Sequence, residues 1–212
     1  MKNAGGELGL KGWMRLSFKF KARELEQLSK FGPHIGRGQR LTDMQALANA
    51  LPEGFRDCVA SLGFQTRPNR AIGFVKSKET NWSLPWHQDR VIAMPEKIDD
   101  PQYSNWTCKS GIWHCEPSAK LLRHMAFAYI AFDSVGAGQG GLEIAEGTHR
   151  FGKIDAKNIA SHIHGSNIAR PNLERGEVLL ISALTLHRSA VLSEHKERRA
   201  LRLDFDRSKD AS

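Results

Sequence analysis

The sequence has no long apolar run, and its longest one, at residues 126–132, is far shorter than the roughly 20 residues that cross a bilayer. Residues 1–28 lack the apolar core of a secretory leader, so we expect no such signal. Cysteine is scarce, because Cys58, Cys108 and Cys115 are an odd number and form no CxxC pair. This argues against a four-thiolate zinc site and for reduced thiols. We therefore expect a cytoplasmic protein without a membrane span.

Internal repeats and low-complexity tracts are also absent. The 212 residues are 40% hydrophobic and 25% charged, which is typical of a globular protein. At roughly 100–200 residues per domain, this length favours one domain, and it buries enough apolar surface to fold without disulfides. We expect a single domain over residues 1–212, with a basic N-terminal segment at 1–40 and the core at 70–206.

The formal net charge of +8 is unevenly distributed. Residues 1–40 contain nine Lys or Arg against three Asp or Glu, so most of the excess belongs to this segment. No zinc finger, aromatic RNA-binding signature or helix-turn-helix accompanies it, so we do not expect nucleic acid as a partner. A solvated basic face explains the charge, and a polyanion or an acidic partner is the alternative.

Hydrophobic periodicity divides the chain into two parts. Residues 22–30 and 42–51 have apolar positions three and four apart, which predicts two short helices, the second capped by Thr42 and ended by Pro52. From about residue 71, short segments rich in Val, Ile, Leu and Phe alternate with Gly, Pro and Asn clusters, which predicts strands. We expect a mainly β protein with flanking helices, an antiparallel sandwich or barrel packed against a helical N-terminal third.

The segment Trp86-His87-Gln88-Asp89 places a histidine and an aspartate two positions apart. In a strand such residues project from the same face, so the His87 imidazole and the Asp89 carboxylate can reach one point. First-row divalent metals bind this combination of ligands. Alone the motif is weak, because many chains contain it by chance and a surface histidine near an aspartate is its ordinary explanation.

A second histidine ends the apolar segment that starts at Glu177. In one continuous strand, His187 and Ser189 would share a face. Arg198 lies eleven residues beyond His187, and the polar connection predicts a hairpin that places Arg198 beside His187 and Ser189. Two histidines and one carboxylate form a facial triad that leaves three positions open on Fe(II). An inward arginine, with a serine hydroxyl beside it, suits a ligand carboxylate.

Taken in order, these motifs resemble the phytanoyl-CoA dioxygenase family of Fe(II)- and 2-oxoglutarate-dependent oxygenases, most closely its bacterial branch. The resemblance covers roughly residues 70–206. It is carried by NWSLPWHQD at 81–89, WHCEP at 113–117, GGLEIAEGTHR at 140–150, and HRS at 187–189 followed by RRA at 198–200. One small departure is Glu146-Gly147-Thr148, which stands where relatives usually have Pro-Gly-Ser.

For the metal, the resemblance implies a double-stranded β-helix, or cupin-like jelly roll, in which His87, Asp89 and His187 bind the iron. A rival pair of histidines, His162 and His164, lies in a polar segment without a matching carboxylate. We expect that pair in an exposed loop rather than on the metal.

For the co-substrate, the resemblance implies that Arg198 binds the distal carboxylate of 2-oxoglutarate with help from Ser189. It also implies that Tyr129 lines the same pocket, with Asn81 as a further candidate.

For the substrate, the resemblance is less informative, because Trp-His-Cys-Glu at 113–116 stands where relatives often have Pro-His-Val-Gln. His114 and Trp113 are candidates for the pocket wall. Arg202 shares the strand face of Arg198 and is a candidate partner of an anionic substrate, with an ion pair to Asp204 as the alternative.

The implied reaction hydroxylates an unactivated C–H bond of a small molecule, consuming 2-oxoglutarate and O2 and releasing succinate and CO2. Asp89 favours hydroxylation, because halogenating relatives have Gly or Ala at this position. Two other functions stay open: a non-catalytic β-helix protein whose basic N-terminal segment binds a partner, and a zinc-dependent cupin-like enzyme. The sequence leaves the oligomeric state open.

Overall fold

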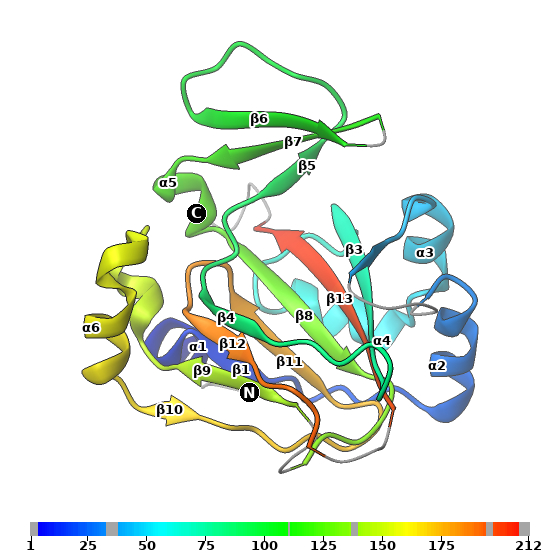
Figure 1. The fold of residues 1–212 in the computed structure, drawn as a ribbon. Coiled ribbons are helices and arrows are strands. Elements are labelled where there is room, and N and C mark those ends of the chain that lie inside the picture. Colours follow the sequence, from blue (N-terminus) through cyan, green and yellow to red (C-terminus); the bar gives the residue numbers. More distant parts are fainter. Residues whose placement is uncertain (1–3, 33–37, 110, 137–139, 194–196, 208–212) are drawn as a thin grey trace.

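A computed structural model describes residues 4–32, 38–109, 111–136, 140–193 and 197–207 (Figure 1). Its largest sheet is antiparallel, with six strands in the order β1-β11-β8-β13-β3-β2. In that order the strands are β1 (Trp13–Arg15), β11 (Val178–Ser182), β8 (Met125–Ala131), β13 (Arg198–Asp206), β3 (Arg70–Lys76) and β2 (Gln39–Arg40).

A four-stranded antiparallel sheet forms the second wall of the barrel, in the order β10-β9-β12-β4. Its strands are β10 (Ile168–Ala169), β9 (Leu142–Ala145), β12 (His187–Ser189) and β4 (Leu84–His87). Side chains from both sheets meet in one buried cluster, in which Ile144 of β9 packs with Phe127 of β8 and Leu179 of β11. The expected jelly roll is confirmed, and the site lies between its two walls.

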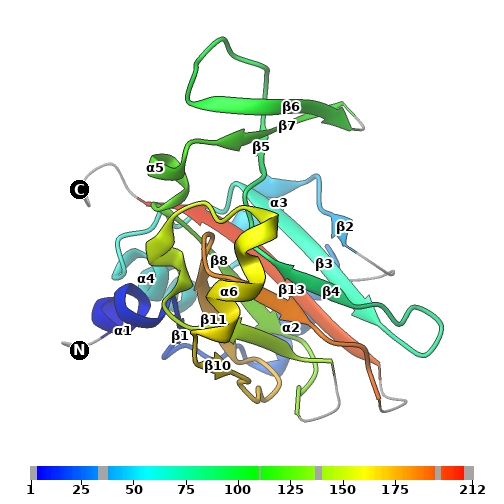
Figure 2. The ribbon, with the colours of Figure 1, turned by 60° about the vertical axis from the view of Figure 1, so that its left-hand side comes forward.

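A third sheet stands at one end of the barrel (Figures 1 and 2). It is antiparallel, and its order is β5-β7-β6, formed by β5 (Ile92–Met94), β7 (Ile112–Pro117) and β6 (Tyr103–Lys109). The short helix α5 (Ala119–Leu122) then leads the chain back into β8.

Helices cover the outer face of the six-stranded sheet. They are α1 (Ala4–Lys11), α2 (Ala22–Ser29), α3 (Met44–Ala50) and α4 (Glu53–Ala60). The leucines of α2 and α3 pack with Leu201, Leu203 and Phe205 of β13 in one buried cluster. The N-terminal third is not wholly helical, because β1 and β2 extend the sheet. In front of the barrel strands in Figure 2 lies α6 (Ile159–His164), which follows η1 (Thr148–Phe151) and η2 (Ala156–Asn158) along the chain.

The two predicted helices form where expected, at α2 and α3, but the N-cap of α3 is Asp43 rather than Thr42. The Asp43 carboxylate accepts a hydrogen bond from the Ala46 amide at 2.9 Å, which satisfies one of the free N–H groups at the helix start. Pro52 lies after the end of α3 and is the N-cap of α4.

The hairpin predicted between residues 187–189 and 198–206 is wrong. The segment that starts at Glu177 is interrupted after Ser182, so that β11 belongs to one sheet and β12 to the other. Both edges of β13 are already paired, with β3 and with β8, in the register that buries its apolar face under the helices. Ser189 and Arg198 still meet, because both contact the carbonyl oxygen of Gly140.

None of the helices in the described part of the chain is long and apolar enough to cross a bilayer.

Gly176, before β11, is expected to be essential for stability. Its φ is +87°, and a Cβ there would collide with the carbonyl oxygen of Phe20. We expect Gly176→Ala to lower the free energy of unfolding by more than about 2 kcal/mol in urea denaturation, because both backbone strain and the collision oppose it. Gly9→Ala is the control: it lies in α1 with open space around it, so stability should rise by about 0.5–1 kcal/mol. Equal effects of the two changes would contradict this account.

Candidate metal centre and co-substrate pocket

Neighbouring antiparallel strands bring the two predicted histidine ligands together. His87 at the end of β4 lies directly opposite His187 at the start of β12, and their ring centroids are 4.3 Å apart. Asp89 follows two residues after His87, and its backbone N–H donates to the carbonyl of Ala183 at 2.9 Å. One ligand atom from each of the three residues lies within 4.8 Å of the others. The predicted triad is therefore within reach of one first-row metal ion.

Backbone carbonyls orient both imidazoles. Nδ1 of His87 donates to the carbonyl of Pro85 at 2.8 Å, and Nδ1 of His187 donates to that of Thr185 at 2.9 Å. Nε2 is then the free acceptor, and on His187 it lies 3.2 Å from Oδ2 of Asp89. A backbone acceptor on the second ring nitrogen is the usual way in which proteins fix a metal-binding tautomer.

The charge states also fit a divalent cation. Burial, and then the neighbouring His187, lower the pKa of His87 to about 4, so this imidazole is neutral at neutral pH. Burial opposes ionisation of Asp89, but the Arg202 guanidinium and His187 hold the pKa of this carboxyl well below its usual range. A carboxylate and a neutral imidazole are the forms that bind metals.

Arg202 of β13 holds the Asp89 carboxylate in place. Its Nη1 lies 2.7 Å from Oδ1 of Asp89, and its Nε lies 2.5 Å from Oδ1 of Asp204. Asp204 in turn is 2.5 Å from the guanidinium of Arg70, and the Arg202 guanidinium lies over the ring of Phe127 at 4.2 Å. The alternative ion pair with Asp204 is therefore present, and a contact of Arg202 with an anionic substrate stays a prediction.

A cavity extends from the two histidines to Arg198, with Ser189 and Tyr129 in its wall. The Arg198 guanidinium lies 5.9 Å from the centroid of the Tyr129 ring. Arg198 Nε and the Tyr129 hydroxyl are buried and have no hydrogen-bond partner among the described residues. These two donors without partners, together with the Ser189 hydroxyl, can donate hydrogen bonds to one carboxylate of a diacid. The residues of the pocket therefore fit 2-oxoglutarate.

Lys76, which the sequence motifs do not predict, lies behind the wall of this pocket and contacts Ser189. It lies opposite Arg198 on β3 and is completely buried. Its Nζ donates to Oγ of Ser189 at 2.7 Å and to the carbonyl of Ala190, and lies 4.6 Å from the ring centroid of Trp82. Burial, and then Arg198, lower the pKa of Lys76 to about 7. Strand alternation puts Lys76 on the same face as Ile72 and Phe74, and that alternation could have identified it.

Asn81 is engaged elsewhere. Its amide nitrogen donates to the carbonyl of Leu192 at 2.9 Å, and its Oδ1 accepts from the Leu192 N–H at 2.8 Å. Trp82, the next residue, lines the cavity beside Lys76. Asn81 therefore fixes the segment that carries Trp82, and its direct contact with the co-substrate stays a prediction.

The substrate candidates Trp113 and His114 lie on β7 in the third sheet. Trp113 packs edge-on against Trp106 with ring centroids 6.2 Å apart, and Nδ1 of His114 donates to the carbonyl of Ile112 at 3.0 Å. Neither residue lines the cavity of the metal centre in the described part of the chain, so their substrate contacts stay predictions.

The rival pair His162 and His164 is in the helix α6 and not in the loop that we expected. The ring of His162 packs against Phe151 with centroids 4.6 Å apart. Neither residue belongs to a possible metal-binding group among the described residues, in which only His87, Asp89 and His187 form one.

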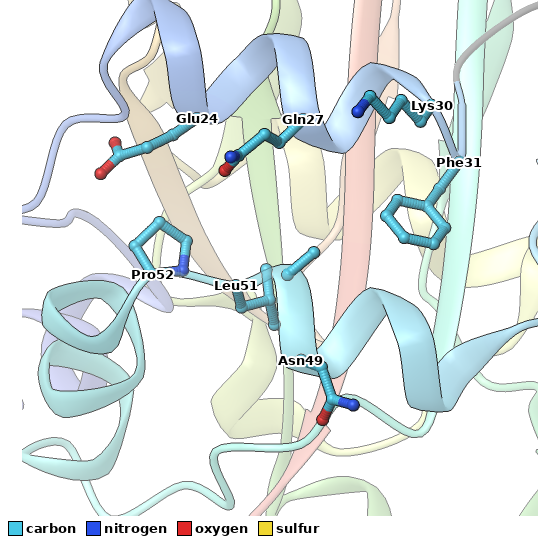
Figure 3. Close-up of a pocket in the computed structure, with 8 residues that line it drawn as sticks. Glu24, Gln27, Lys30, Phe31, Asn49, Leu51 and Pro52 are labelled. Carbon is cyan, nitrogen blue, oxygen red and sulfur yellow. The ribbon is translucent and has the colours of Figure 1, made fainter.

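A groove on the helical side of the molecule is separate from this chemistry. Figure 3 shows Glu24 and Gln27 of α2 above Leu51 and Pro52. Glu24 accepts a hydrogen bond from the Lys21 backbone at 2.7 Å and so caps the start of α2. The groove contains no group of metal ligands and we assign it no function.

The fold and the site together define a non-haem Fe/2-oxoglutarate-type oxygenase. The sequence profile of the phytanoyl-CoA dioxygenase family (PhyH) matches residues 33–200, and the chain belongs to this family. No curated protein matches the sequence.

Solved structures share the fold at low sequence identity. EctD from S. alaskensis, in its apoform, has a TM-score of 0.68 at 15% identity, over 98% of this chain and 77% of that one. AviO1 from Streptomyces viridochromogenes Tue57 has a TM-score of 0.64 at 13% identity, over 97% and 94% of the two chains. The epimerase SnoN, in complex with Fe3+, alpha ketoglutarate and nogalamycin RO, has a TM-score of 0.62 at 11% identity, over 96% and 82%.

Proposed function

We propose that this protein hydroxylates an unactivated C–H bond of a small-molecule substrate, using Fe(II), 2-oxoglutarate and O2 and releasing succinate and CO2. The observation that carries the proposal is that His87, Asp89 and His187 converge within 4.8 Å, and that the two histidines line the cavity that also contains Arg198. Asp89 is retained, which favours hydroxylation over halogenation.

Iron and 2-oxoglutarate, when bound, supply the oxidising chemistry. The chain's own residues would hold and orient them. Nε2 of His87 and of His187 would bind the metal together with the Asp89 carboxylate, whose Oδ1 Arg202 already holds. The apolar side chains of Phe127 and Leu142 line the cavity between the histidines and Arg198, and they limit the access of water to the site.

At the far end of the cavity, Arg198 and Lys76 would bind the distal carboxylate. In the structure their cationic groups contact the carbonyl oxygens of Gly140 and Ala190, respectively. A carboxylate is a stronger acceptor for a cation than a neutral carbonyl, so a diacid would displace these contacts. Ser189, which hydrogen-bonds Lys76, would provide a hydroxyl at the same place.

The experiment that tests the proposal begins with anaerobic protein, Fe(II) and 2-oxoglutarate. We expect a weak metal-to-ligand absorption band in the visible range, and release of succinate when O2 is admitted. Metal analysis of the purified protein separates this activity from a zinc-dependent enzyme, for which the Arg198 pocket would have no role. Binding of polyanions that is sensitive to salt, without any turnover, would favour the non-catalytic alternative.

The compartment that we propose is the cytoplasm. Cys58, Cys108 and Cys115 are all free thiols in the structure, which supports a reducing environment.

Lys76 should make co-substrate binding depend on pH. With its pKa near 7, Lys76 is protonated below pH 7 and loses its charge as the pH rises, while the carboxylates of 2-oxoglutarate stay ionised. We therefore expect the affinity for 2-oxoglutarate to fall by about tenfold between pH 6 and pH 8.5, since one charge-assisted bond is lost. Isothermal titration calorimetry in buffers of different ionisation enthalpy should show proton uptake on binding near pH 7.5.

The Lys76→Met variant should bind 2-oxoglutarate weakly at every pH between 6 and 8.5. Its affinity for 2-oxoglutarate should no longer depend on pH. Lys78→Met is the matched control, because Lys78 is an exposed lysine two residues further along. An unchanged pH profile in Lys76→Met would show that Lys76 does not bind the diacid.

A further inference from the structure

A cleft of about 560 Å³ opens at the end of the barrel below the third sheet. Ile92 and Met94 of β5, Tyr103 of β6 and Met125 of β8 form much of its lining, and Asp206 at the end of β13 faces them. Apolar side chains form most of this surface, Asp206 places a carboxylate side chain on it, and Arg207 lines it as well. A concave, largely apolar surface that carries some polar groups is typical of small-molecule sites.

The cleft lies two strand spacings from the metal centre. The Asp89 N–H donates to the carbonyl of Ala183 at 2.9 Å, and the Ala183 N–H donates to that of Met125 at 3.0 Å. Two hydrogen-bonded strand spacings therefore separate the main chains of Met125 and Asp89, or roughly 10 Å. Two residues beyond Met125, the ring of Phe127 lies 5.2 Å from the ring of His187.

The inward face of β13 presents a row of charges across this region. Arg202 and Asp204, in the middle of the row, form an ion pair with each other. The residues at the two ends of the row, Arg198 and Asp206, differ from this middle pair, because neither forms an ion pair among the described residues. Arg198 faces the co-substrate cavity at one end, and Asp206 faces the cleft at the other.

Asp206 has few interactions for a half-buried carboxylate. The amide nitrogen of Asn69 donates to it at 3.0 Å. Burial, and then the nearby Asp204, raise the pKa of Asp206, although the Asn69 hydrogen bond acts in the opposite direction. The adjacent Arg207 stacks its guanidinium over Phe64 at 5.1 Å and forms no ion pair with this carboxylate. A cation beside Asp206 would replace the solvation that burial removes.

We propose that the substrate carries a cationic nitrogen, an amine or a guanidine, that pairs with Asp206, and an apolar body that lies on Ile92 and Met125. This inference rests on the proposed function and adds the substrate class to it. The carbon that is oxidised would then lie at the end of the apolar body away from the cationic group, because Asp206 pairs with Met125 and is one strand spacing farther from Asp89 than Met125 is.

The test compares three probes of nearly equal shape, 3-phenylpropylamine, 3-phenylpropan-1-ol and 3-phenylpropanoate. Each is titrated by NMR into the protein loaded with 2-oxoglutarate and with Mn(II), which is paramagnetic and replaces iron without turnover. We expect the amine to bind at least tenfold more tightly than the alcohol, and the carboxylate to bind most weakly. Mn(II) should broaden the phenyl protons of the amine more than the protons beside its nitrogen.

Asp206→Asn keeps the shape of the side chain and should remove the preference for the amine. Glu96→Gln is the matched control and should leave the preference intact, because Glu96 is an exposed carboxylate that follows Pro95, a lining residue, but does not itself line the cleft. Equal binding of amine and alcohol, or an unchanged preference in Asp206→Asn, would overturn the inference while Mn(II) and 2-oxoglutarate still bind. Failure of Mn(II) and 2-oxoglutarate themselves to bind would overturn the proposed function as well.

Discussion

His87→Ala is expected to abolish the release of succinate and to weaken Fe(II) binding by more than about 100-fold, since even residues that only support a metal ligand contribute 10–100-fold. The reason is geometric: His87 and His187 face one another across two paired strands, and the remaining two ligands cannot replace the lost nitrogen. Fe(II) binding is measured by competition with a chelator, and succinate release by a coupled assay.

The fold should survive this change, because the His87 side chain is about a quarter exposed, at 28%. His162→Ala is the matched control and also tests the rival histidine pair. The ring of His162 packs on Phe151 in α6, so its removal should leave metal binding and turnover unchanged. If His162→Ala lost the metal and His87→Ala kept it, the assignment of the triad would be wrong.

Arg198→Met is expected to weaken 2-oxoglutarate binding by about 30- to 150-fold, which corresponds to the roughly 2–3 kcal/mol of a charge-assisted hydrogen bond to a buried partner. Methionine keeps much of the length and the apolar stem but removes the guanidinium that faces the cavity. Fe(II) binding should be preserved, because Arg198 contacts none of the metal ligands in the structure. The co-substrate affinity is measured by calorimetry under anaerobic conditions.

Arg199→Met is the control, from the next position of the same strand. The Arg199 guanidinium pairs with Asp133 at 2.7 Å and does not line the cavity. We expect this variant to lose some thermal stability and to keep its affinity for 2-oxoglutarate. Equal losses of affinity in the two variants would point to general destabilisation rather than to a carboxylate-binding role for Arg198.

Several features of the site follow from the local order of residues. Two-residue alternation in strands sets which side chains share a face. It accounts for Leu201, Leu203 and Phe205 under the helices and for Arg202 and Asp204 in the barrel interior. The motif spacing and the resemblance to a known family together supplied the fold and the three metal ligands, which the structure brings within 4.8 Å of one another.

Other features depended on which strands pair, and local order does not specify this. Residues 187–189 and 198–206 are separated by a short connection that suited a hairpin, yet they belong to different sheets. The reason is that β13 is a central strand whose two edges bind β3 and β8, and this arrangement buries more apolar surface than a local hairpin would.

The sequence by itself, through its motifs and the family resemblance that they carry, thus predicted the class of fold, the three candidate metal ligands and the inward arginine. Only the tertiary structure placed Lys76 against Ser189, Arg202 on Asp89, and Asp206 in a cleft at the barrel's end. The contacts of Lys76 with Ser189 and of Arg202 with Asp89 each join residues that are 113 positions apart. Their partners are set by strand order and register, which result from the burial of the whole core.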